Sequence, residues 1–323
     1  MSNVGGFMKA DKEKKVLVMG GLIVDKYIVT DKYPLKGEDV LITDSFNRVG
    51  GCTINVASTL NNLGVDAYPV STIGGDENGN IIEKYLLEAN INKNCVIVEK
   101  DKNTGYCLVI LDGTSERTFM TYKGCEEEFS CNLINRDLLK EIKFVYLTGY
   151  YLLGSFAAEI LSFIKDIKEL GASIMFDPGP LVDEIQSEIL QLALDLCDIF
   201  IPNVNEIEKV KIKLNITQEF GELAEKNKIQ YVIIKNGSKG VTAYKGNKKY
   251  ERLAYSVKAI DTTGAGDSFA AGCIYGFLNE MEFEEILNVG SACGALNTTF
   301  IGPNGKYGIE NIERLMKEEN DNA

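Results

Sequence analysis

The chain has 323 residues, of which 45% are hydrophobic and 25% are charged, as expected for a globular protein with a sizeable core. Its formal net charge of −13 argues against a general surface for nucleic acid or anionic membranes, so a phosphate site must be a local arrangement. Because the sequence contains no histidine, Ser-His-Asp and Cys-His mechanisms are excluded, and acid–base chemistry must use Asp, Glu, Lys, Tyr or Cys.

The first part of the chain is predicted to contain a leader, strands and one helix. Residues 1–15 are a polar leader, and the apolar run Val16–Val24 predicts a strand. Residues 31–49 combine a turn with an alternating stretch, which predicts short strands. Cys52–Leu63 has apolar residues at helical spacing and stops at Gly64, a residue suited to the end of a helix.

Strand and helix patterns then alternate along the chain. Strands are predicted at Ala67–Ile73, Phe144–Leu147, Ser173–Phe176 and Asp198–Ile201, each followed by a helix, at Ile81–Ala89, Phe156–Leu170, Ile185–Leu194 and Ile207–Lys211. This order is typical of a mainly parallel sheet with helices on both faces. A late group of strands at 231–253 and helices from Phe269 to Lys317 complete the predicted fold.

Two segments interrupt this order and predict a separate small sheet. Residues 31–49 and 104–123 alternate around turns, and we assign them to a β-sheet lid. The α/β core domain then comprises residues 16–30, 50–103 and 124–317. The predicted fold is a three-layer sandwich with an inserted lid.

The strongest chemical signal is Asp261-Thr-Thr-Gly-Ala-Gly-Asp267, which precedes an apolar run predicted to be a buried helix. Gly264 and Gly266 allow backbone amides to converge on an anion, and a helix N-terminus strengthens such a site. Asp267 lies where a carboxylate can accept a proton from an attacking hydroxyl. An aspartate that caps a helix after a glycine turn is the structural alternative.

With three further motifs, this segment resembles the ribokinase-like, or PfkB, family of sugar and nucleoside kinases, from about Val16 to about Lys317. The resemblance implies a ribokinase-like three-layer sandwich that uses ATP and Mg²⁺. It also implies that Gly264, Ala265 and Gly266 supply the anion hole and that Asp267 is the catalytic base.

The substrate side of the resemblance begins at Gly50-Gly51-Cys-Thr-Ile-Asn55, which is similar to the family's di-glycine signature at the lid hinge. Asn55 offers a donor and an acceptor to a hydroxyl, and Asp25 matches the family's ligand for a substrate hydroxyl. Arg117, in a strand similar to the lid strands of sugar kinases, is a further candidate substrate contact. The alternatives are an ordinary glycine turn, a solvated aspartate and an exposed arginine.

The nucleotide side includes Asn203-Val-Asn-Glu206, which resembles the family's Asn-x-x-Glu motif. Glu206 would then hold Mg²⁺ through water, whereas a simple helix start is the alternative. The turn that contains Gly237 and Gly240 resembles the family's glycine turn beside the nucleotide. The family often has threonine where Lys235 stands, so the role of Lys235 stays open between a phosphate contact and an exposed strand end.

The resemblance also assigns Asn297 to the nucleotide site, and Asp261 and Thr263 to a monovalent-cation site with K⁺ as the candidate ion. The loop at 298–305 would complete that cation site. Neither a GxxxxGK[ST] nor a GxGxxG pattern occurs, which excludes the Walker and dinucleotide-binding motifs.

We therefore expect an ATP-dependent kinase that phosphorylates a primary hydroxyl of a small sugar or sugar-like polyol. Cys52 stands where the family's fructose-phosphate kinases have lysine, and Ser58 stands in place of a later arginine, so a clamp for a second phosphate is missing. A nucleoside kinase is the alternative within the family, with Phe46 and Phe119 or Tyr122 as candidate aromatic contacts. A catalytically silent ligand-binding regulator is the alternative from another class.

The sequence also gives expectations for partners and location. Eight scattered cysteines without a CxxC pair fit reduced thiols, and no signal peptide or membrane span is evident, so we expect a cytoplasmic protein. We expect a small-molecule sugar substrate and no nucleic-acid or membrane partner. The exposed edges of the lid sheet leave a homodimer through the lid as one option for the oligomeric state.

Overall fold

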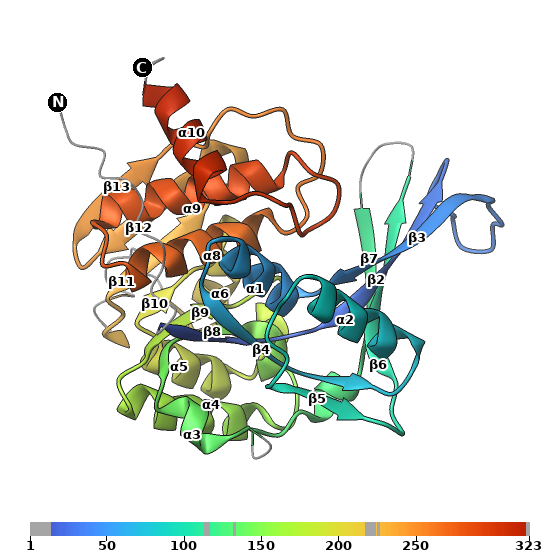
Figure 1. Cartoon of the computed structure of the whole chain (residues 1–323), viewed down its shortest axis with the longest axis horizontal. Coiled ribbons are helices and arrows are strands. Elements are labelled where there is room, and N and C mark those ends of the chain that lie inside the picture. The colour runs from blue at the N-terminus through green and yellow to red at the C-terminus, as the bar shows by residue number, and fades with distance from the viewer. Residues whose placement is uncertain (1–13, 113–116, 132–133, 217–223, 225–226, 321–323) are drawn as a thin grey trace.

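The computed structural model describes residues 14–112, 117–131, 134–216, 224 and 227–320. The predicted leader therefore lies outside the described residues except for Lys14 and Lys15, and Lys15 already belongs to the first strand. Figure 1 shows a central sheet between layers of helices, with a second sheet at one side.

A central sheet forms the middle layer of the molecule. Its strands are β1 (Lys15–Met19), β4 (Asp66–Gly74), β5 (Val96–Glu99), β8 (Ile142–Thr148), β9 (Ser173–Asp177), β10 (Ile199–Phe200), β11 (Tyr231–Lys235), β12 (Val241–Lys245) and β13 (Lys248–Arg252). The described strands follow the order β13-β12-β11-β10-β9-β8-β1-β4-β5. All neighbours pair in parallel except β11–β12 and β12–β13, which are antiparallel. The predicted mainly parallel sheet is confirmed.

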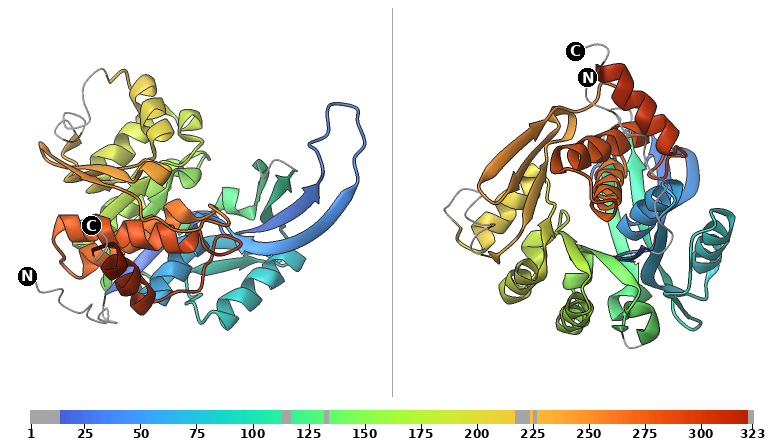
Figure 2. Two further views of the ribbon diagram at one scale, coloured as in Figure 1. Left: turned by 90° about the horizontal axis from the view of Figure 1, so that it is seen from above. Right: turned by 60° about the vertical axis from the view of Figure 1, so that its left-hand side comes forward.

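Helices cover both faces of this sheet, as the views in Figures 1 and 2 show together. One layer contains α1 (Cys52–Asn62), α2 (Glu77–Glu88), α8 (Ala265–Leu278), α9 (Phe283–Asn297) and α10 (Ile309–Asn320), and the other contains α3 (Arg136–Leu139), α4 (Ala157–Glu169), α5 (Ser187–Leu196) and α6 (Val204–Lys213). The alternation of the apolar side chains in β1 explains the two cores. Val16 and Val18 belong to the hydrophobic cluster under the first layer, and Leu17 and Met19 belong to the cluster under the second.

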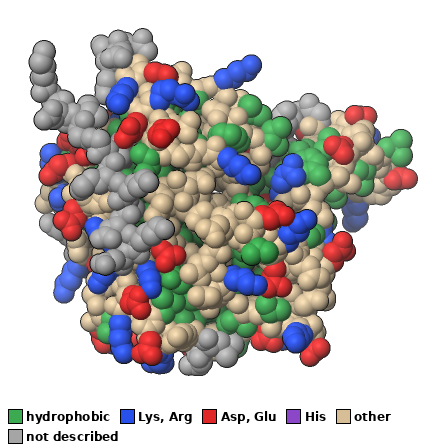
Figure 3. Space-filling view, in the orientation of Figure 1, with side chains coloured by type: hydrophobic (Ala, Val, Ile, Leu, Met, Phe, Trp, Pro, Cys, Tyr) green, Lys and Arg blue, Asp and Glu red, His purple; other side chains and the backbone are tan. Residues whose placement is uncertain are grey.

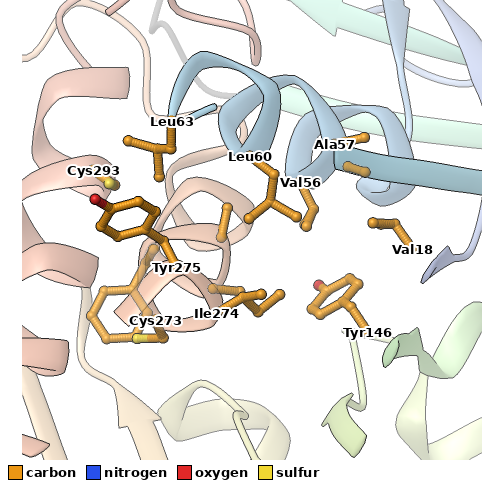
Figure 4. Close-up of a cluster of buried hydrophobic side chains, with 14 of the residues drawn as sticks. Val18, Val56, Ala57, Leu60, Leu63, Tyr146, Cys273, Ile274, Tyr275 and Cys293 are labelled. Atoms are coloured by element: carbon orange, nitrogen blue, oxygen red, sulfur yellow. The ribbon is translucent and has the colours of Figure 1, made fainter. Parts of the chain in front are cut away.

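The cluster under the first layer fixes α8 against α1. Figure 4 shows side chains that these two helices share with the neighbouring elements, namely Val18, Val56, Ala57, Leu60, Leu63, Tyr146, Cys273, Ile274, Tyr275 and Cys293. Gly272 and Gly290 let α8 and α9 approach closely, because a Cβ at Gly272 would lie 2.9 Å from the Cα of Gly290. This packing holds the N-termini of α1 and α8 at the same edge of the sheet.

The second sheet is the lid, and it contains β2 (Ile23–Thr30), β3 (Ile42–Gly50), β6 (Thr104–Leu111) and β7 (Arg117–Gly124). The described strands follow the order β3-β2-β6-β7, with β2 and β6 parallel and the other pairs antiparallel. Figure 2 shows β2 and β3 extending well beyond the three-layer core.

One boundary differs from the sequence prediction. The segment 16–30 was assigned to the core, but its second half is β2 and belongs to the lid. Gly20 and Gly21 separate β1 from β2, so the apolar run that predicted one strand is divided between two sheets. The remaining domain boundaries stay predictions, and residues 113–116 of the predicted lid segment 104–123 lie outside the described residues.

The surface gives no sign of a single-sign charged patch on the face drawn in Figure 3, where acidic and basic side chains are interspersed. Among the described residues, no helix has the length and apolar character that crossing a membrane would need.

Candidate active site

The predicted site residues meet at the carboxyl ends of the parallel strands, where α/β sheets commonly bind ligands. β9 ends at Asp177, β11 ends at Lys235, and Asn203 follows β10 and bridges to Lys235. The first turn of α8 supplies Asp267 at the same edge, and the lid supplies Asp25. Their electrostatic effects on one another place these charged groups, together with Glu206, in one cluster, which we call the acidic cluster.

The glycine turn before α8 has the geometry of an anion-binding helix start. Gly264 is the N-cap residue with φ of 71°, and a Cβ there would lie 2.6 Å from the carbonyl oxygen of Pro303. Ser268 makes the first α-helical bond, to the oxygen of Gly264 at 2.9 Å, so the amides of Gly266 and Asp267 precede the hydrogen-bonded part of the helix. The Ala265 amide donates to the oxygen of Thr262 at 3.3 Å. The two later amides are therefore better placed for an anion than that of Ala265.

Gly266→Val is expected to leave the fold intact and to reduce turnover by roughly 10²-fold, the scale for losing one amide donor to a transition state. The φ of Gly266 is an ordinary one, and the nearest atom to an added Cβ is Lys235 Nζ at 3.7 Å. A side chain would thus fit the protein but occupy the space in front of the ammonium group. Thermal unfolding and steady-state kinetics measure the two effects, and a stable, fully active variant would reduce the turn to a helix cap.

Asp261 and Asn297 hold this turn in place. Asp261 Oδ1 accepts from the Thr263 amide at 2.8 Å and from Thr263 Oγ1 at 2.7 Å, while its Oδ2 accepts from the Gly302 amide at 2.9 Å. Asn297 donates to the Thr263 carbonyl at 2.8 Å and accepts from the Gly305 amide at 3.0 Å. These contacts bring the predicted cation-site residues together with the loop at 298–305. They also give Asp261 and Asn297 a structural role that the sequence did not predict.

Asp267 is half-buried, and Asn55 holds its carboxylate by donating from Nδ2 to Oδ2 at 2.8 Å. Burial raises the pKa of Asp267 to about 6, against the lowering effect of the Asn55 hydrogen bond. The other end of the Asn55 amide, Oδ1, is buried and has no partner among the described residues. The predicted contact of Asn55 with substrate stays a prediction, and the structure shows that its amide group is bonded to the predicted base.

The position of Asp25 explains why residue 50, at the predicted lid hinge, is a glycine. The side chain is buried, and a Cβ on Gly50 would lie 2.1 Å from Asp25 Oδ2. Gly51 has φ of 93°, and a Cβ there would lie 2.3 Å from the carbonyl oxygen of Gly21. Both glycines are therefore required by close approach, whereas their role at a substrate site stays a prediction. Burial and the negative charge of Asp267 raise the pKa of Asp25 to about 7.

The raised pKa of Asp25 predicts that ionisation of this carboxyl group lowers the stability of the folded protein at and above neutral pH. The folded protein holds this proton more tightly than the unfolded chain, so the free energy of unfolding falls as pH rises from about 4 to about 7 and stays low above that. Asp25→Asn should raise Tm at pH 8 by roughly 2 °C or more, with the gain vanishing near pH 4. Calorimetry at both pH values measures this effect, and an equal shift at both would exclude the ionisation as its cause.

Lys235 is not the exposed strand end that the sequence left open. Its ammonium group donates to Asp177 Oδ2 at 2.5 Å, and the two side chains are 14% and 8% exposed. Burial lowers the pKa of Lys235, but the charges of Asp177 and Glu206 outweigh burial and raise it above its ordinary value. The sequence analysis missed Asp177, although an aspartate followed by Pro-Gly at the end of a predicted parallel strand is a usable signal.

Glu206 is tied to Asn203 in a capping box at the start of α6. Glu206 Oε2 accepts from the Asn203 amide at 2.7 Å and Oε1 accepts from Asn203 Nδ2 at 2.7 Å, while Asn203 Oδ1 accepts from the Glu206 amide at 2.9 Å. Burial and the charge of Asp177 raise the pKa of Glu206 to about 7. The hydrogen bonds of an ordinary helix start are thus present, and the Glu206 carboxylate also belongs to the acidic cluster.

Two predicted contacts remain, the glycine turn after β11 and Arg117 in the lid. Gly237 and Gly240 have φ of 59° and 95° in the turn between β11 and β12, and a Cβ on Gly240 would lie 2.0 Å from the oxygen of Arg252. This turn follows Lys235 directly, as predicted for a loop beside a nucleotide. Arg117 is the first residue of β7, where it pairs with Leu111; its side chain lies outside the described part of the structure.

The acidic residues fit an indirectly held magnesium ion. Within the described part of the chain, no three carboxylate or thiol groups gather closely enough to form a metal site by themselves. The buried carboxylates of Asp177 and Glu206 nevertheless face one ammonium group, that of Lys235, which leaves one negative charge without a counter-charge when both carboxylates are ionised. A hydrated cation beside them would offset this charge, which suits Mg²⁺ because it retains several waters.

Comparison with known proteins agrees with this geometry. The profile described as "pfkB family carbohydrate kinase" matches residues 13–306. The chain is similar to an ATP-dependent ribose-1-phosphate kinase of Halopiger xanaduensis, with 26% identity over 308 residues that cover 95% of this chain and 99% of the relative.

Two solved structures share the fold. The nucleoside kinase of Methanocaldococcus jannaschii, an archaeal member of the ribokinase family, superposes with a TM-score of 0.82 at 22% identity over 97% of this chain and 100% of that protein. Ribokinase of Arabidopsis thaliana, complexed with ribose and ATP, gives a TM-score of 0.81 at 21% identity over 94% and 99% of the two chains. The chain therefore belongs to the pfkB family of carbohydrate kinases, as its motifs predicted, and is a phosphotransferase that acts on a hydroxyl group.

Proposed function

We propose that the protein is an ATP-dependent sugar kinase that transfers the γ-phosphoryl group of MgATP to a primary hydroxyl of a small sugar or polyol. The observation that carries this proposal is the Asn55–Asp267 hydrogen bond of 2.8 Å beside the amides of the α8 N-terminus. It joins a candidate base for a hydroxyl to a candidate cradle for a phosphoryl group.

In the proposed mechanism, Asp25 and Asn55 bind hydroxyls of the acceptor and direct its primary hydroxyl toward Asp267. Asp267 accepts the hydroxyl proton as the oxygen forms its bond to the γ-phosphorus and the bond to ADP breaks. The amides of Gly266 and Asp267 and the ammonium of Lys235 stabilise the charge on the transferred group. Asp177 positions Lys235 through their ion pair.

The nucleotide and its cation would lie along the edge formed by Lys235, the Gly237–Gly240 turn and α6. Glu206 and Asp177 would hold Mg²⁺ through water, and the ion would neutralise phosphate charge during transfer. Asp261, Thr263 and the loop at 298–305 would form a K⁺ site. We also propose that the lid closes over the acceptor about its glycine hinge and excludes water.

A nucleoside kinase is the second candidate, and the inner face of the lid favours it. Tyr27 and Phe46 are stacked with ring centroids 4.8 Å apart, and their row continues through Val109 to Phe119. Asp25 lies on the same face, because residues two apart in a strand point to the same side. An apolar, aromatic wall beside a hydroxyl ligand fits a nucleobase attached to ribose. Tyr122 pairs with Tyr106 on the opposite face, so of the two predicted partners only Phe119 shares the face of Phe46.

A screen of ADP release with sugars, polyols, sugar phosphates and nucleosides tests the proposed function. We expect an unphosphorylated sugar or polyol to have kcat/KM at least roughly tenfold above any phosphorylated sugar. The acceptor end of the site contains the carboxyl groups of Asp25 and Asp267, and Cys52 stands where the family's fructose-phosphate kinases have a lysine. A nucleoside in first place would support the second candidate. A sugar phosphate in first place would contradict the proposal and direct attention to Arg48, which lies opposite Asp25 in the strand register. The absence of ADP release with every acceptor would favour the silent regulator.

We further propose a cytoplasmic location and retain the lid-mediated homodimer. All eight cysteines are free, in keeping with a reducing compartment. Ile42, Met120 and Tyr122 of the lid are 58%, 53% and 47% exposed, which would suit burial against a second copy.

A further inference from the structure

A pocket lies outside the acidic cluster, on the side of α1 and α2 that faces the segment before α10. Its volume is about 480 Å³, within the range of small-molecule sites. We name it the side pocket and define it by Ser58, Asn61, Asn62, Tyr85, Lys306 and Asn311, which line it. Figure 1 shows α1 and α2 in the same helical layer, with the chain leading into α10 nearby.

Three carboxamides of the side pocket each use one end to bind protein. Asn61 donates from Nδ2 to the oxygen of Ala89 at 3.0 Å, and Asn62 donates from Nδ2 to the oxygen of Gly305 at 3.0 Å. Asn311 accepts through Oδ1 from the Gly308 amide at 3.0 Å. These bonds fix the orientation of each amide and leave two carbonyl oxygens and one NH₂ group for a ligand.

The side pocket also contains a positive charge on an otherwise acidic protein. Lys306 is exposed, and within the described residues its ammonium group has no carboxylate partner. Tyr85 contributes an aromatic ring whose hydroxyl lies 3.1 Å from Ser58 Oγ, and Ile91 contributes an apolar wall. Carboxamides recognise hydroxyls, an aromatic ring can contact the apolar face of a sugar ring, and an unpaired ammonium recognises an anion.

We propose that the side pocket is a regulatory site for a small polyhydroxylated anion, with sugar phosphates as the class. The segment that carries Lys306 is bonded to both halves of the catalytic machinery. The Gly305 amide donates to Asn297, which in turn holds the Thr263 carbonyl of the anion-binding turn, and Asn304 donates from Nδ2 to the oxygen of Val49 beside the lid hinge at 3.0 Å. A ligand that holds this segment in place should therefore stabilise the anion-binding turn before α8. It is expected to lower KM for MgATP by roughly fivefold or more.

Binding is tested by calorimetry with ribose 5-phosphate and fructose 6-phosphate, without nucleotide, on the full chain. Lys306→Gln removes the charge. Gly308→Val fills the side pocket without strain, because the φ of Gly308 is ordinary and its Cβ would meet only the Asn62 oxygen, at 3.7 Å. Lys165→Gln on α4, in the opposite layer, is the matched control, and Asp25→Ala reports binding at the acceptor site.

We expect at least one of the two sugar phosphates to bind wild type, Lys165→Gln and Asp25→Ala alike, and to bind Lys306→Gln and Gly308→Val roughly tenfold more weakly or worse. Binding that is lost in Asp25→Ala and kept in both pocket variants would assign the ligand to the acceptor site and overturn the proposal. No binding of either compound to wild type at millimolar concentration would also overturn it. Equal affinity for inorganic phosphate, or for the neutral polyol ribitol, would contradict the predicted ligand class.

The regulatory effect is measured separately, as KM for MgATP with the acceptor found in the screen. This second readout rests on the proposed kinase activity, whereas the binding readout does not, so the two proposals fail in distinguishable ways. Binding at the side pocket with an unchanged KM would contradict the coupling through Asn297 and Asn304.

Discussion

Asp267→Asn is expected to lower kcat by roughly 10²-fold or more while leaving ATP affinity nearly unchanged. The carboxylate loses its ability to accept a proton, but the amide keeps its size and the backbone amides of the α8 N-terminus remain. A pre-steady-state or coupled assay gives kcat, and equilibrium titration gives the affinity for ATP. A kcat within about threefold of wild type, in a folded variant, would remove Asp267 from the role of base.

The pH dependence provides an independent check on the same residue. Burial raises the pKa of Asp267 to about 6, and only the ionised carboxylate can act as a base. For wild type, kcat/KM should therefore rise with pH through about 6 and level off above about 7. The residual activity of Asp267→Asn should lack this acid limb, whereas a limb at the same pH in both proteins would assign it to another group, such as Asp25.

Lys235→Met is expected to be the most destabilising of the proposed site variants. It breaks a buried ion pair and leaves Asp177 and Glu206 without their cation, which typically costs roughly 3–5 kcal/mol of the free energy of unfolding. It also removes the ammonium that faces the phosphate site, so kcat/KM for MgATP should fall by roughly 10²-fold. Chemical denaturation and steady-state kinetics measure these two losses.

The double variant Lys235→Met/Asp177→Asn separates the two roles of this lysine. Removing the acid should recover much of the lost stability, because the buried charge is gone, but it should not recover turnover. Lys168→Met is the matched control: Lys168 pairs with Asp198 at 2.7 Å near the amino ends of the strands, remote from the phosphate site. If the double variant regained near wild-type kinetics, Lys235 would be a structural residue only.

The fold was largely determined by patterns that are local in the sequence. Alternating strand and helix periodicity predicted the three layers, since each element buries its apolar face in a way that its own residues record. The division of Val16–Val24 between two sheets could not be predicted in this way. Both halves are apolar, and which sheet each half joins depends on pairing partners that lie 25 or more residues away along the chain.

The candidate site shows the same distinction. Asp267, Gly264 and the Gly50–Gly51 pair were identified from the sequence because the backbone geometry they need restricts residue choice within a few positions. Asp177 was missed, and the role of Lys235 stayed open, because each side chain is defined by its ion pair with the other. The two residues lie 58 positions apart and meet only because β9 and β11 belong to one sheet.

The sequence by itself thus determined the class of fold and the family, and it predicted Asp267 as the base. Only the tertiary structure showed that Asn55 orients Asp267 and that Lys235 forms an ion pair with Asp177. It also showed that Asp25 leaves no room for a side chain at residue 50. The physical reason is that backbone preferences and apolar periodicity act between near neighbours, whereas hydrogen bonds, ion pairs and shifted pKa values arise between groups that only the packing of distant segments brings within a few ångströms.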